Sequence, residues 1–378
     1  MGRGVVKARE ARDLFGNGGN RRCAVGVGAA LDRLFDVLVD DDRINVIGIY
    51  IEAIRDIPRF SRMAARAAAR RKPVVVIKVG RSETAAAVVL GHTSSLAGLP
   101  ALYDALFERL GVVRVDTLNQ FLESLKVLSV LGPLSGRRLG AITGSGGESA
   151  MIADYAHQIG VELSPLSSDQ VATLEAGLAD LVNVINPLDM TVVTMDDPAQ
   201  VALCYETFAA GDFDVVATMI EAYDGTDAPF ADLNAQMIEV FCDAARRHSM
   251  PAIVGGALAE TLPQWVRRAA MKRGAAPAQG LEEMIYAVDV AARFGEFYRT
   301  LDDAPELALA EPAAQCGELL VLDEWQSKAW LAGAGVPTPG GRAVRPSEAL
   351  DAARAIGFPV ALKVVDAELL HKTEAGAV

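Results

Sequence analysis

The sequence predicts an α/β protein with two doubly wound parallel sheets, followed by a shorter C-terminal segment. Short runs of β-branched residues alternate with longer amphipathic or alanine-rich stretches, and the connections between them are short. Such alternation is typical of parallel strands joined by helical crossovers, whose helices cover both faces of the sheet. Hydrophobic residues make up 51% of the 378 residues and charged residues 22%, which is enough apolar material for a sizeable core.

Charge and cysteine content narrow the class of protein further. The formal net charge is −13, which excludes a general nucleic-acid binder or a binder of anionic membranes, because both need a basic surface. No apolar run is long enough for a membrane span, and the N-terminus lacks the apolar core of a secretory signal. The cysteines at positions 23, 204, 242 and 316 show no zinc-site or disulfide spacing. We therefore expect reduced thiols and a cytoplasmic protein.

Residues 1–29 are expected to form an irregular arm, and the first α/β domain is expected at residues 30–132. The arm combines an excess of basic residues with a GNGGN cluster and sustains neither a helical nor a strand period. In the domain, buried strands are expected at residues 46–51, 73–80 and 112–115. Helices are expected near residues 31–38 and at residues 58–72, 99–110 and 118–131.

A break at residues 132–136 precedes a second α/β domain, expected at residues 137–300. Its strands are expected at residues 138–143, 215–220 and 252–255, and its helices at 148–159 and near 198–210, 230–247, 260–273 and 281–298. A linker rich in alanine, acidic residues and proline follows at residues 301–316. Residues 317–378 then show two helical stretches, 323–333 and 346–356, and one strand, 359–365. These are too few elements for an independent domain, so we expect the first part of a larger one.

His92 is the first candidate for chemistry. It lies in a loop of small and hydroxyl residues, 91–98 (GHTSSLAG), which follows the second predicted strand. An imidazole can act as a nucleophile, so a histidine can accept a phosphoryl group on a ring nitrogen and pass it on. That task needs an acceptor for the other ring nitrogen and donors for the phosphate oxygens. The alternative is a surface loop with an incidental histidine.

Glu52 and the segment 144–147 could supply these groups. Glu52 ends the strand 46–51, and residues at the carboxyl ends of parallel strands line the functional crevice. A carboxylate there could fix the tautomer of a nearby imidazole. Gly144, Ser145, Gly146 and Gly147 follow a strand and open a helix, whose free N–H groups and dipole favour phosphate. The alternatives are a solvated Glu52 paired with Arg55, and an ordinary strand-to-helix turn.

Lys363 is the remaining candidate. A lysine in the apolar run 359–365 could meet a nucleotide phosphate, or could be an edge lysine whose ammonium reaches water. Residues 186–191 (NPLDMT) have clear turn chemistry but no readable chemical role. His157 and His248 are expected to be exposed or capping residues.

Taken together, these segments resemble the NDP-forming acyl-CoA synthetase family, which is related to succinyl-CoA synthetase. The resemblance rests on seven stretches in the family's order: IGIYIEAIRD, KPVVVIKVGRSE, GHTSSLAG, GVVRVDTL, TGSGGESAMIADYA, NPLDMT and FPVALKVVDAELLHKTEAGAV. It implies two flavodoxin-like, succinyl-CoA synthetase-like domains followed by the start of an ATP-grasp domain.

The resemblance also implies roles for individual residues. His92 would be the phosphohistidine, Glu52 the carboxylate that orients it, and residues 144–147 the start of a helix that holds phosphate. Lys363 would be the lysine of the nucleotide domain, with His371 and Lys372 in its HK motif. The family reaction converts an acid, CoA and ATP into acyl-CoA, ADP and phosphate through an acyl phosphate and the phosphohistidine. The implied ligands are ATP or ADP with Mg²⁺, CoA and a small carboxylic acid, and the implied protein partner is a complementary ligase chain or a second copy.

The sequence departs from the family in three respects. Ser94 stands where the family's loop usually has glycine, no CoA-binding domain precedes residue 30, and the ATP-grasp segment stops after its opening. We therefore expect that this chain alone cannot complete the ligase cycle. The alternatives are a non-catalytic or interaction fragment, and part of a protein acyltransferase with related ligase-like domains.

Overall fold

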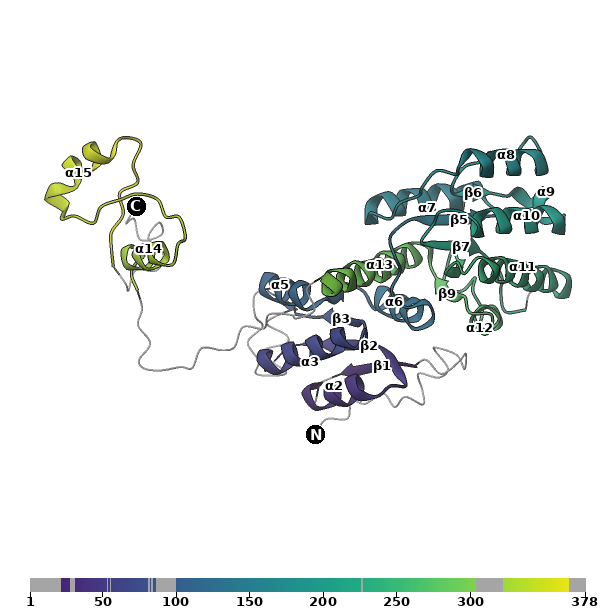
Figure 1. Ribbon diagram of the computed structural model, residues 1–378, viewed down its shortest axis with the longest axis horizontal. Helices are drawn as coiled ribbons and strands as arrows, with labels where there is room; N and C mark the ends of the chain where they lie inside the picture. Colours follow the sequence, from purple (N-terminus) through teal and green to yellow (C-terminus); the bar gives the residue numbers. More distant parts are fainter. Residues whose placement is uncertain are drawn as a thin grey trace. The chain divides into compact units, whose positions relative to one another are not determined.

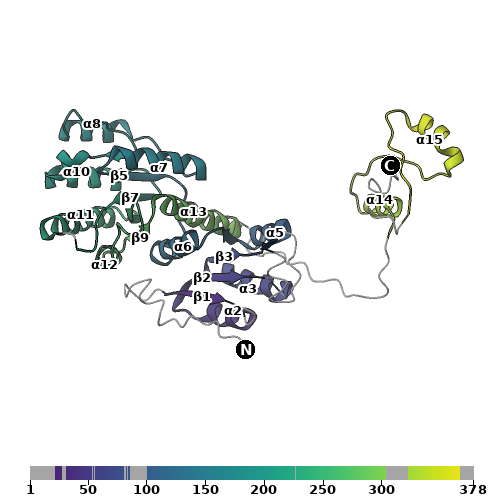
Figure 2. The same cartoon turned by 180° about the vertical axis from the view of Figure 1, so that it is seen from behind.

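The computed structural model describes residues 22–27, 31–52, 54, 56–80, 82, 84–85, 100–225, 227–303 and 322–366. The chain divides into two compact units, residues 1–311 and residues 312–378. The first unit is an α/β structure with two parallel sheets (Figure 1, Figure 2). The predicted fold class is therefore confirmed.

The first sheet has four parallel strands in the order β1-β2-β3-β4. Its strands are β1 (Arg22–Val27), β2 (Ile44–Ile51), β3 (Val74–Lys78) and β4 (Val112–Val115). Its helices are α2 (Leu31–Asp40), α3 (Ile57–Ala69), α5 (Pro100–Leu110) and α6 (Leu118–Leu131). The three strands predicted from buried apolar runs are all present. Helices cover both faces of the sheet, which explains why these strands are apolar on both sides.

Alternate side chains of the central strands enter separate cores on the two faces. On one face, Ile47 of β2 and Val76 of β3 belong to a core with Phe60 of α3 and Phe107 of α5, whose ring centroids lie 6.0 Å apart. On the other face, Val75 belongs to a core with helix α6. This alternation is the two-residue period expected of strands, and it anchors the carboxyl ends of β2 and β3 between packed helices.

Strand β1 differs from the sequence prediction. Residues 22–27 were expected to belong to an irregular arm, whereas the structure pairs them in parallel with β2 from Arg22 opposite Ile44 to Val27 opposite Tyr50. The segment RCAVGV is short and adjoins a basic, glycine-rich stretch, so its strand pattern is weak. Pairing with the apolar strand β2 supplies the backbone hydrogen bonds that stabilise it.

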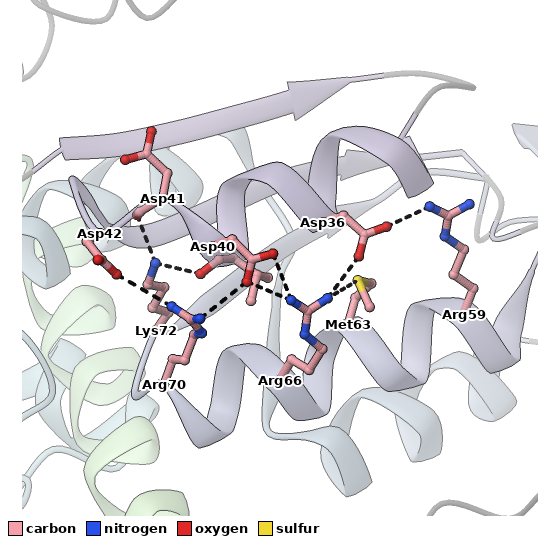
Figure 3. Close-up of polar contacts among 10 residues, drawn as sticks. Asp36, Asp40, Asp41, Asp42, Arg59, Met63, Arg66, Arg70 and Lys72 are labelled. Atoms are coloured by element: carbon pink, nitrogen blue, oxygen red, sulfur yellow. Dashed lines mark hydrogen bonds and ion pairs between the residues drawn. The ribbon is translucent and has the colours of Figure 1, made fainter.

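A ladder of ion pairs joins α2 and the turn after it to α3 (Figure 3). Arg66 of α3 lies at its centre, 3.0 Å from Asp36 and 2.6 Å from Asp40. Arg59 extends the ladder at one end, 2.6 Å from Asp36, and Arg70 at the other, 3.4 Å from Asp40. All these side chains are at least partly exposed, so the ladder adds to the apolar packing beneath it rather than replacing it.

The second sheet has five parallel strands in the order β6-β5-β7-β8-β9. The strands are β5 (Leu139–Thr143), β6 (Leu188–Asp189), β7 (Val215–Met219), β8 (Ala252–Gly256) and β9 (Ala276–Gln279). The helices are α7 (Gly146–Ile159), α8 (Ser168–Gly177), α9 (Thr191–Met195), α10 (Pro198–Ala209), α11 (Ala228–Arg247), α12 (Gln264–Lys272) and α13 (Leu281–Asp303). In order of sequence this is the 2-1-3-4-5 arrangement of flavodoxin-like folds.

The two sheets share one unit because helix α13 packs against helices of both. It contacts α6 of the first sheet and α7 of the second, and both views place it between them (Figure 1, Figure 2). The connector at residues 132–136, predicted as a break, is attached to this helix. Leu134 N–H donates to the Ala291 carbonyl at 3.0 Å, and Arg299 donates to the Ser135 carbonyl at 2.6 Å.

The second unit contains α14 (Glu324–Gly333), a 3₁₀ turn (Pro346–Glu348) and α15 (Ala349–Ile356). Both predicted helical stretches are present, but the predicted strand at residues 359–365 is wrong, since these residues adopt no regular structure. A strand needs a partner for its backbone hydrogen bonds, and the described part of this unit contains no other strand. Among its described residues, only Ala352 is buried.

Candidate functional site

Glu52 lies at the carboxyl edge of the first sheet, as predicted. It directly follows Ile51, the last residue of β2, and it is exposed. Ile51 is paired with Lys78, the last residue of β3. The carboxyl ends of the two central strands therefore present a carboxylate and an ammonium group at one edge, where ligands bind in parallel α/β sheets.

Lys78 is a residue of this edge that the sequence analysis missed. Its side chain is only 6% exposed, its ammonium group donates to the Val79 carbonyl, and its Nζ lies 4.8 Å from the centroid of the Tyr103 ring. Burial lowers the pKa of Lys78, while the nearby Glu52 carboxylate acts in the opposite direction. A lysine at the end of the run VVVIK was the available signal, because a charged residue in a buried strand needs a specific partner.

His92 lies outside the described residues. After β3 the described chain runs to Gly80 and includes residues 82 and 84–85, and it resumes at Pro100, where α5 begins. Tyr103, in the first turns of α5, contacts Lys78 through its ring and accepts a hydrogen bond from Ile54 N–H at 3.3 Å. Both described flanks of the His92 segment therefore adjoin the edge that carries Glu52. The pairing of Glu52 with His92 stays a prediction.

Residues 144–147 follow strand β5 and include the first two residues of helix α7, so they open a helix as predicted. Ser145 occupies the N-cap position with an extended backbone, but its side chain makes no capping hydrogen bond. Instead, Thr143 Oγ1 accepts from Ser145 N–H and donates to the Ser145 carbonyl, both at 2.8 Å. Ser145, Gly146 and Gly147 are exposed. The helix start thus presents backbone N–H groups at the surface, which is the arrangement that suits an anion.

Two glycines of this link lie close to neighbouring side chains. A Cβ atom on Gly144 would lie 2.6 Å from Met195 Sδ of α9, and one on Gly146 would lie 3.2 Å from Asp189 Oδ2 of β6. Asp189 and α9 therefore border the start of α7. Two hydroxyl oxygens of α9, those of Thr191 and Thr194, are buried without a hydrogen-bond partner among the described residues.

Glu148, the third residue of α7, was also missed. It is 9% exposed, and its carboxyl group lies among the polar groups of Thr143 and of Glu221, which follows β7. Burial raises the pKa of Glu148 to about 7, and the charges of Glu221 and Asp189 act in the same direction. The stretch TGSGGESAMIADYA pointed to the helix start, but nothing in it indicated that Glu148 meets a carboxylate more than seventy residues later.

Asn186 of the NPLDMT stretch has a structural role. Asn186 donates from Nδ2 to the carbonyls of Leu139 at 2.8 Å and Ser164 at 2.9 Å, and its Oδ1 accepts from Ala141 N–H at 3.0 Å. These bonds fix the approach to β6, whose Asp189 is paired with Thr143. Asn186 therefore positions Asp189 beside the start of α7.

Lys363 is exposed and lies 3.1 Å from Glu324 Oε1 at the start of α14, which also pairs with Lys328 at 2.9 Å. His371 and Lys372 lie outside the described residues. Nε2 of His248 lies at hydrogen-bond distance, 2.8 Å, from Oε1 of Glu206. His157 is exposed on α7. Within the described ranges, no group of three or more His, Cys, Asp or Glu side chains is arranged to hold a metal ion. No helix there is both long and apolar enough to cross a bilayer.

The fold and its edges define a class of protein: flavodoxin-like α/β domains with charged groups and a glycine-led helix start at the carboxyl ends of their strands. Comparison with known families agrees. Residues 18–128 match the succinyl-CoA ligase like flavodoxin domain. Residues 313–378 match the ATP-grasp domain.

Comparison with individual proteins narrows the class. The ADP-forming acetate–CoA ligase I of Archaeoglobus fulgidus is 27% identical over 96% of this chain and 52% of its own length. The ADP-forming acetate–CoA ligase of Methanocaldococcus jannaschii is 25% identical over 91% of this chain and 50% of its own length. An alpha subunit of the ADP-forming acetate–CoA ligase II of Pyrococcus furiosus is 31% identical over 50% of this chain. These similarities support membership of the NDP-forming acyl-CoA synthetase family, and the chain spans about half the length of the curated relatives it matches.

A solved structure supports the fold. The dinucleotide-forming acetyl-coenzyme A synthetase 1 of Ca. Korarchaeum cryptofilum, in complex with phosphate and ADP, matches with a TM-score of 0.60 at 22% identity. The match covers 74% of this chain and 59% of that one. At this level of identity the similarity concerns the fold alone.

Proposed function

We propose that this chain is a component of an NDP-forming acyl-CoA synthetase, in which His92 carries the phosphoryl group. The overall reaction converts a carboxylic acid, CoA and ATP into acyl-CoA, ADP and phosphate. The observation that carries the proposal is the edge of the first sheet, where Glu52 ends β2 and both described flanks of the His92 segment adjoin it.

In the phosphoryl step, one ring nitrogen of His92 attacks the phosphorus of an acyl phosphate. The bond between phosphorus and the acyl oxygen breaks, and the carboxylate leaves. In the synthetic direction the same step runs in reverse. Glu52 accepts a hydrogen bond from the other ring nitrogen, which keeps the attacking nitrogen unprotonated and stabilises the positive charge that develops on the ring.

The start of α7 is proposed to hold the phosphoryl group during transfer. Exposed Gly146 and Gly147 offer backbone N–H groups without side chains in the way, and the helix dipole favours an anion there. No positively charged side chain is needed for such a site, which is consistent with a chain of net charge −13.

ATP or ADP with Mg²⁺, CoA and a small carboxylic acid are the proposed substrates, and the cytoplasm is the proposed location. Lys363 would contact a nucleotide phosphate, for which its ammonium would have to leave Glu324. A complementary ligase chain, or a second copy of this chain, would supply the remaining groups. Relatives named as alpha subunits support a partner chain.

Labelling of the full chain with [³²P]acetyl phosphate tests the proposal. We expect label on the wild type that is stable in alkali and lost in acid, as for a phosphoramidate. His92→Ala should abolish it, while His157→Ala, on the exposed surface of α7, should retain it. Glu52→Gln should slow labelling without abolishing it. Absence of label on the wild type, or equal label on His92→Ala, would falsify the assignment.

A non-catalytic interaction subunit is the second candidate. It is favoured by the second unit, whose apolar side chains Trp330, Phe358 and Leu362 are each more than 60% exposed. The labelling experiment separates the two, because an interaction subunit has no reason to take phosphate on His92.

A further inference from the structure

Three buried lysines lie in the described part of the chain, with exposed fractions of 7%, 6% and 6%: Lys72, Lys78 and Lys126. A buried ammonium group is costly unless partners compensate its charge and its three N–H donors. Lys126 lies 2.5 Å from the Glu123 carboxylate. Lys72 donates to two backbone carbonyls, those of Val39 at 2.7 Å and Asp41 at 2.9 Å. These two lysines therefore have the partners that burial requires.

Lys78 is compensated less completely. Its described hydrogen bonds use one donor, which reaches the carbonyl of the next residue, Val79. The ring of Tyr103 faces the ammonium group with its centroid 4.8 Å from Nζ, and a cation–π contact offsets only part of the cost of burial. The pKa of Lys78 is lowered by burial, which agrees with incomplete compensation. The ammonium group therefore has donors and charge available for a further partner.

The position of Lys78 in the fold indicates what that partner is. Lys78 ends β3 opposite Ile51 of β2, and Glu52 follows Ile51 at the edge where parallel α/β sheets bind ligands. Tyr103 holds this edge together, because its ring covers Lys78 while its hydroxyl accepts from Ile54 N–H at 3.3 Å. The edge thus combines a fixed ammonium group with an exposed carboxylate. A phosphoryl dianion is attracted by the first and repelled by the second.

We propose that Lys78 binds the phosphoryl group of the acyl phosphate at this edge and offsets the charge of Glu52. This inference rests on the proposed function, which brings an acyl phosphate to the edge and keeps Glu52 ionised there. A carboxylate beside the reacting group weakens the binding of a dianion, and the net charge of −13 gives the chain no general attraction for one. Lys78 supplies the missing positive charge. Its burial strengthens the interaction, because buried charges are screened less than exposed ones.

Labelling of the full chain at several concentrations of [³²P]acetyl phosphate separates binding from transfer. The concentration that gives the half-maximal labelling rate should rise about tenfold or more in Lys78→Met, because a hydrogen bond to a charged group is lost. Lys78→Arg keeps the charge and should retain most of the affinity. Lys72→Met is the matched control, since Lys72 is equally buried and lies two residues before the start of β3. It should lower the stability and leave the half-maximal concentration unchanged.

Inorganic phosphate tests the same contact without any label on His92. In the full chain labelled with [¹⁵N]lysine, the Nζ resonance that is missing in Lys78→Met belongs to Lys78. Phosphate should shift this resonance and leave that of Lys72 in place. Glu52→Gln should lower the phosphate concentration needed for half of the shift, because it removes the opposing charge. A lysine that only supports the packing of Tyr103 would show neither response.

Two outcomes would overturn the inference. One is a folded Lys78→Met protein whose half-maximal acetyl phosphate concentration equals that of the wild type. The other is a Lys78 resonance that phosphate does not shift. Either result, together with label on wild-type His92, would leave the proposed function standing and remove only this inference. A phosphate-dependent shift of Lys78 in a wild-type chain that takes no label would do the reverse, because the anion site would remain and the phosphohistidine would not.

Discussion

Among the glycines that the structure describes, Gly295 of α13 is the one whose added Cβ would come closest to a backbone atom. A Cβ atom there would lie well within van der Waals contact of the Leu134 carbonyl oxygen and 3.0 Å from its carbonyl carbon. Both atoms are backbone, so neither can turn aside. Gly295→Ala must therefore push the connector at residues 132–136 away from α13. Leu134 is buried, and its N–H bond to Ala291 would be strained at the same time.

The magnitude can be built from these contacts. Overpacking of a buried contact costs about 1–3 kcal/mol, and loss of one hydrogen bond adds about 1 kcal/mol. Alanine is about 1 kcal/mol more favourable than glycine in a helix interior, which offsets part of this cost. The net destabilisation is about 2 kcal/mol, which corresponds to a fall in Tm of about 3 °C for the unit of residues 1–311.

Urea and thermal unfolding followed by circular dichroism measure this effect. Gly147→Ala is the matched control, because it makes the same change on α7, where the nearest atom to the added Cβ would be Ser145 Oγ at 3.7 Å. It should be neutral or slightly stabilising. A Gly295→Ala protein as stable as the wild type would show that α13 and the connector are not held as closely as described.

Two further predictions concern charge. Arg66→Gln removes the centre of the α2–α3 ladder, and we expect a loss of about 0.5 kcal/mol in the free energy of unfolding at low salt; the difference should vanish in 1 M NaCl, and a difference that persists there would contradict an ionic origin. For Glu148, the pKa is raised in the folded protein, so between its unfolded value and about pH 7 the folded state binds more protons than the unfolded state. Stability should therefore fall as pH rises through that window, and Glu148→Gln should lack this component; identical urea midpoints against pH for both proteins would count against the raised pKa.

Strands and helices of the first unit were predictable where periodicity and burial agree. The runs ending at Ile51 and Lys78 are apolar on every side, which only a sheet covered on both faces explains. Strand β9 was missed because it contains Pro277, which strands tolerate at an edge, and β9 is an edge strand. Strand β6 has two residues, too few for any period.

The site was predictable in its backbone and less so in its side chains. Strand ends and glycines locate Glu52 and residues 144–147, because those positions follow from local pattern alone. The burial of Lys78 depends on Tyr103, and the raised pKa of Glu148 depends on burial and on Glu221, so both need the tertiary fold. The roles of His92 and Lys363, and the domain boundaries at residues 30, 132, 137 and 300, stay predictions.

The second unit also gives the chain an optical reporter. Two of the chain's three tryptophans, Trp325 and Trp330, lie on α14 and are 40% and 67% exposed. Trp265 packs against the core of the second sheet. Indole emission shifts to shorter wavelength when the ring leaves water for apolar surroundings. A partner that covers α14 should therefore shift the intrinsic tryptophan emission of the chain to shorter wavelength, without any added label. Trp265 would report separately on whether the second sheet stays folded.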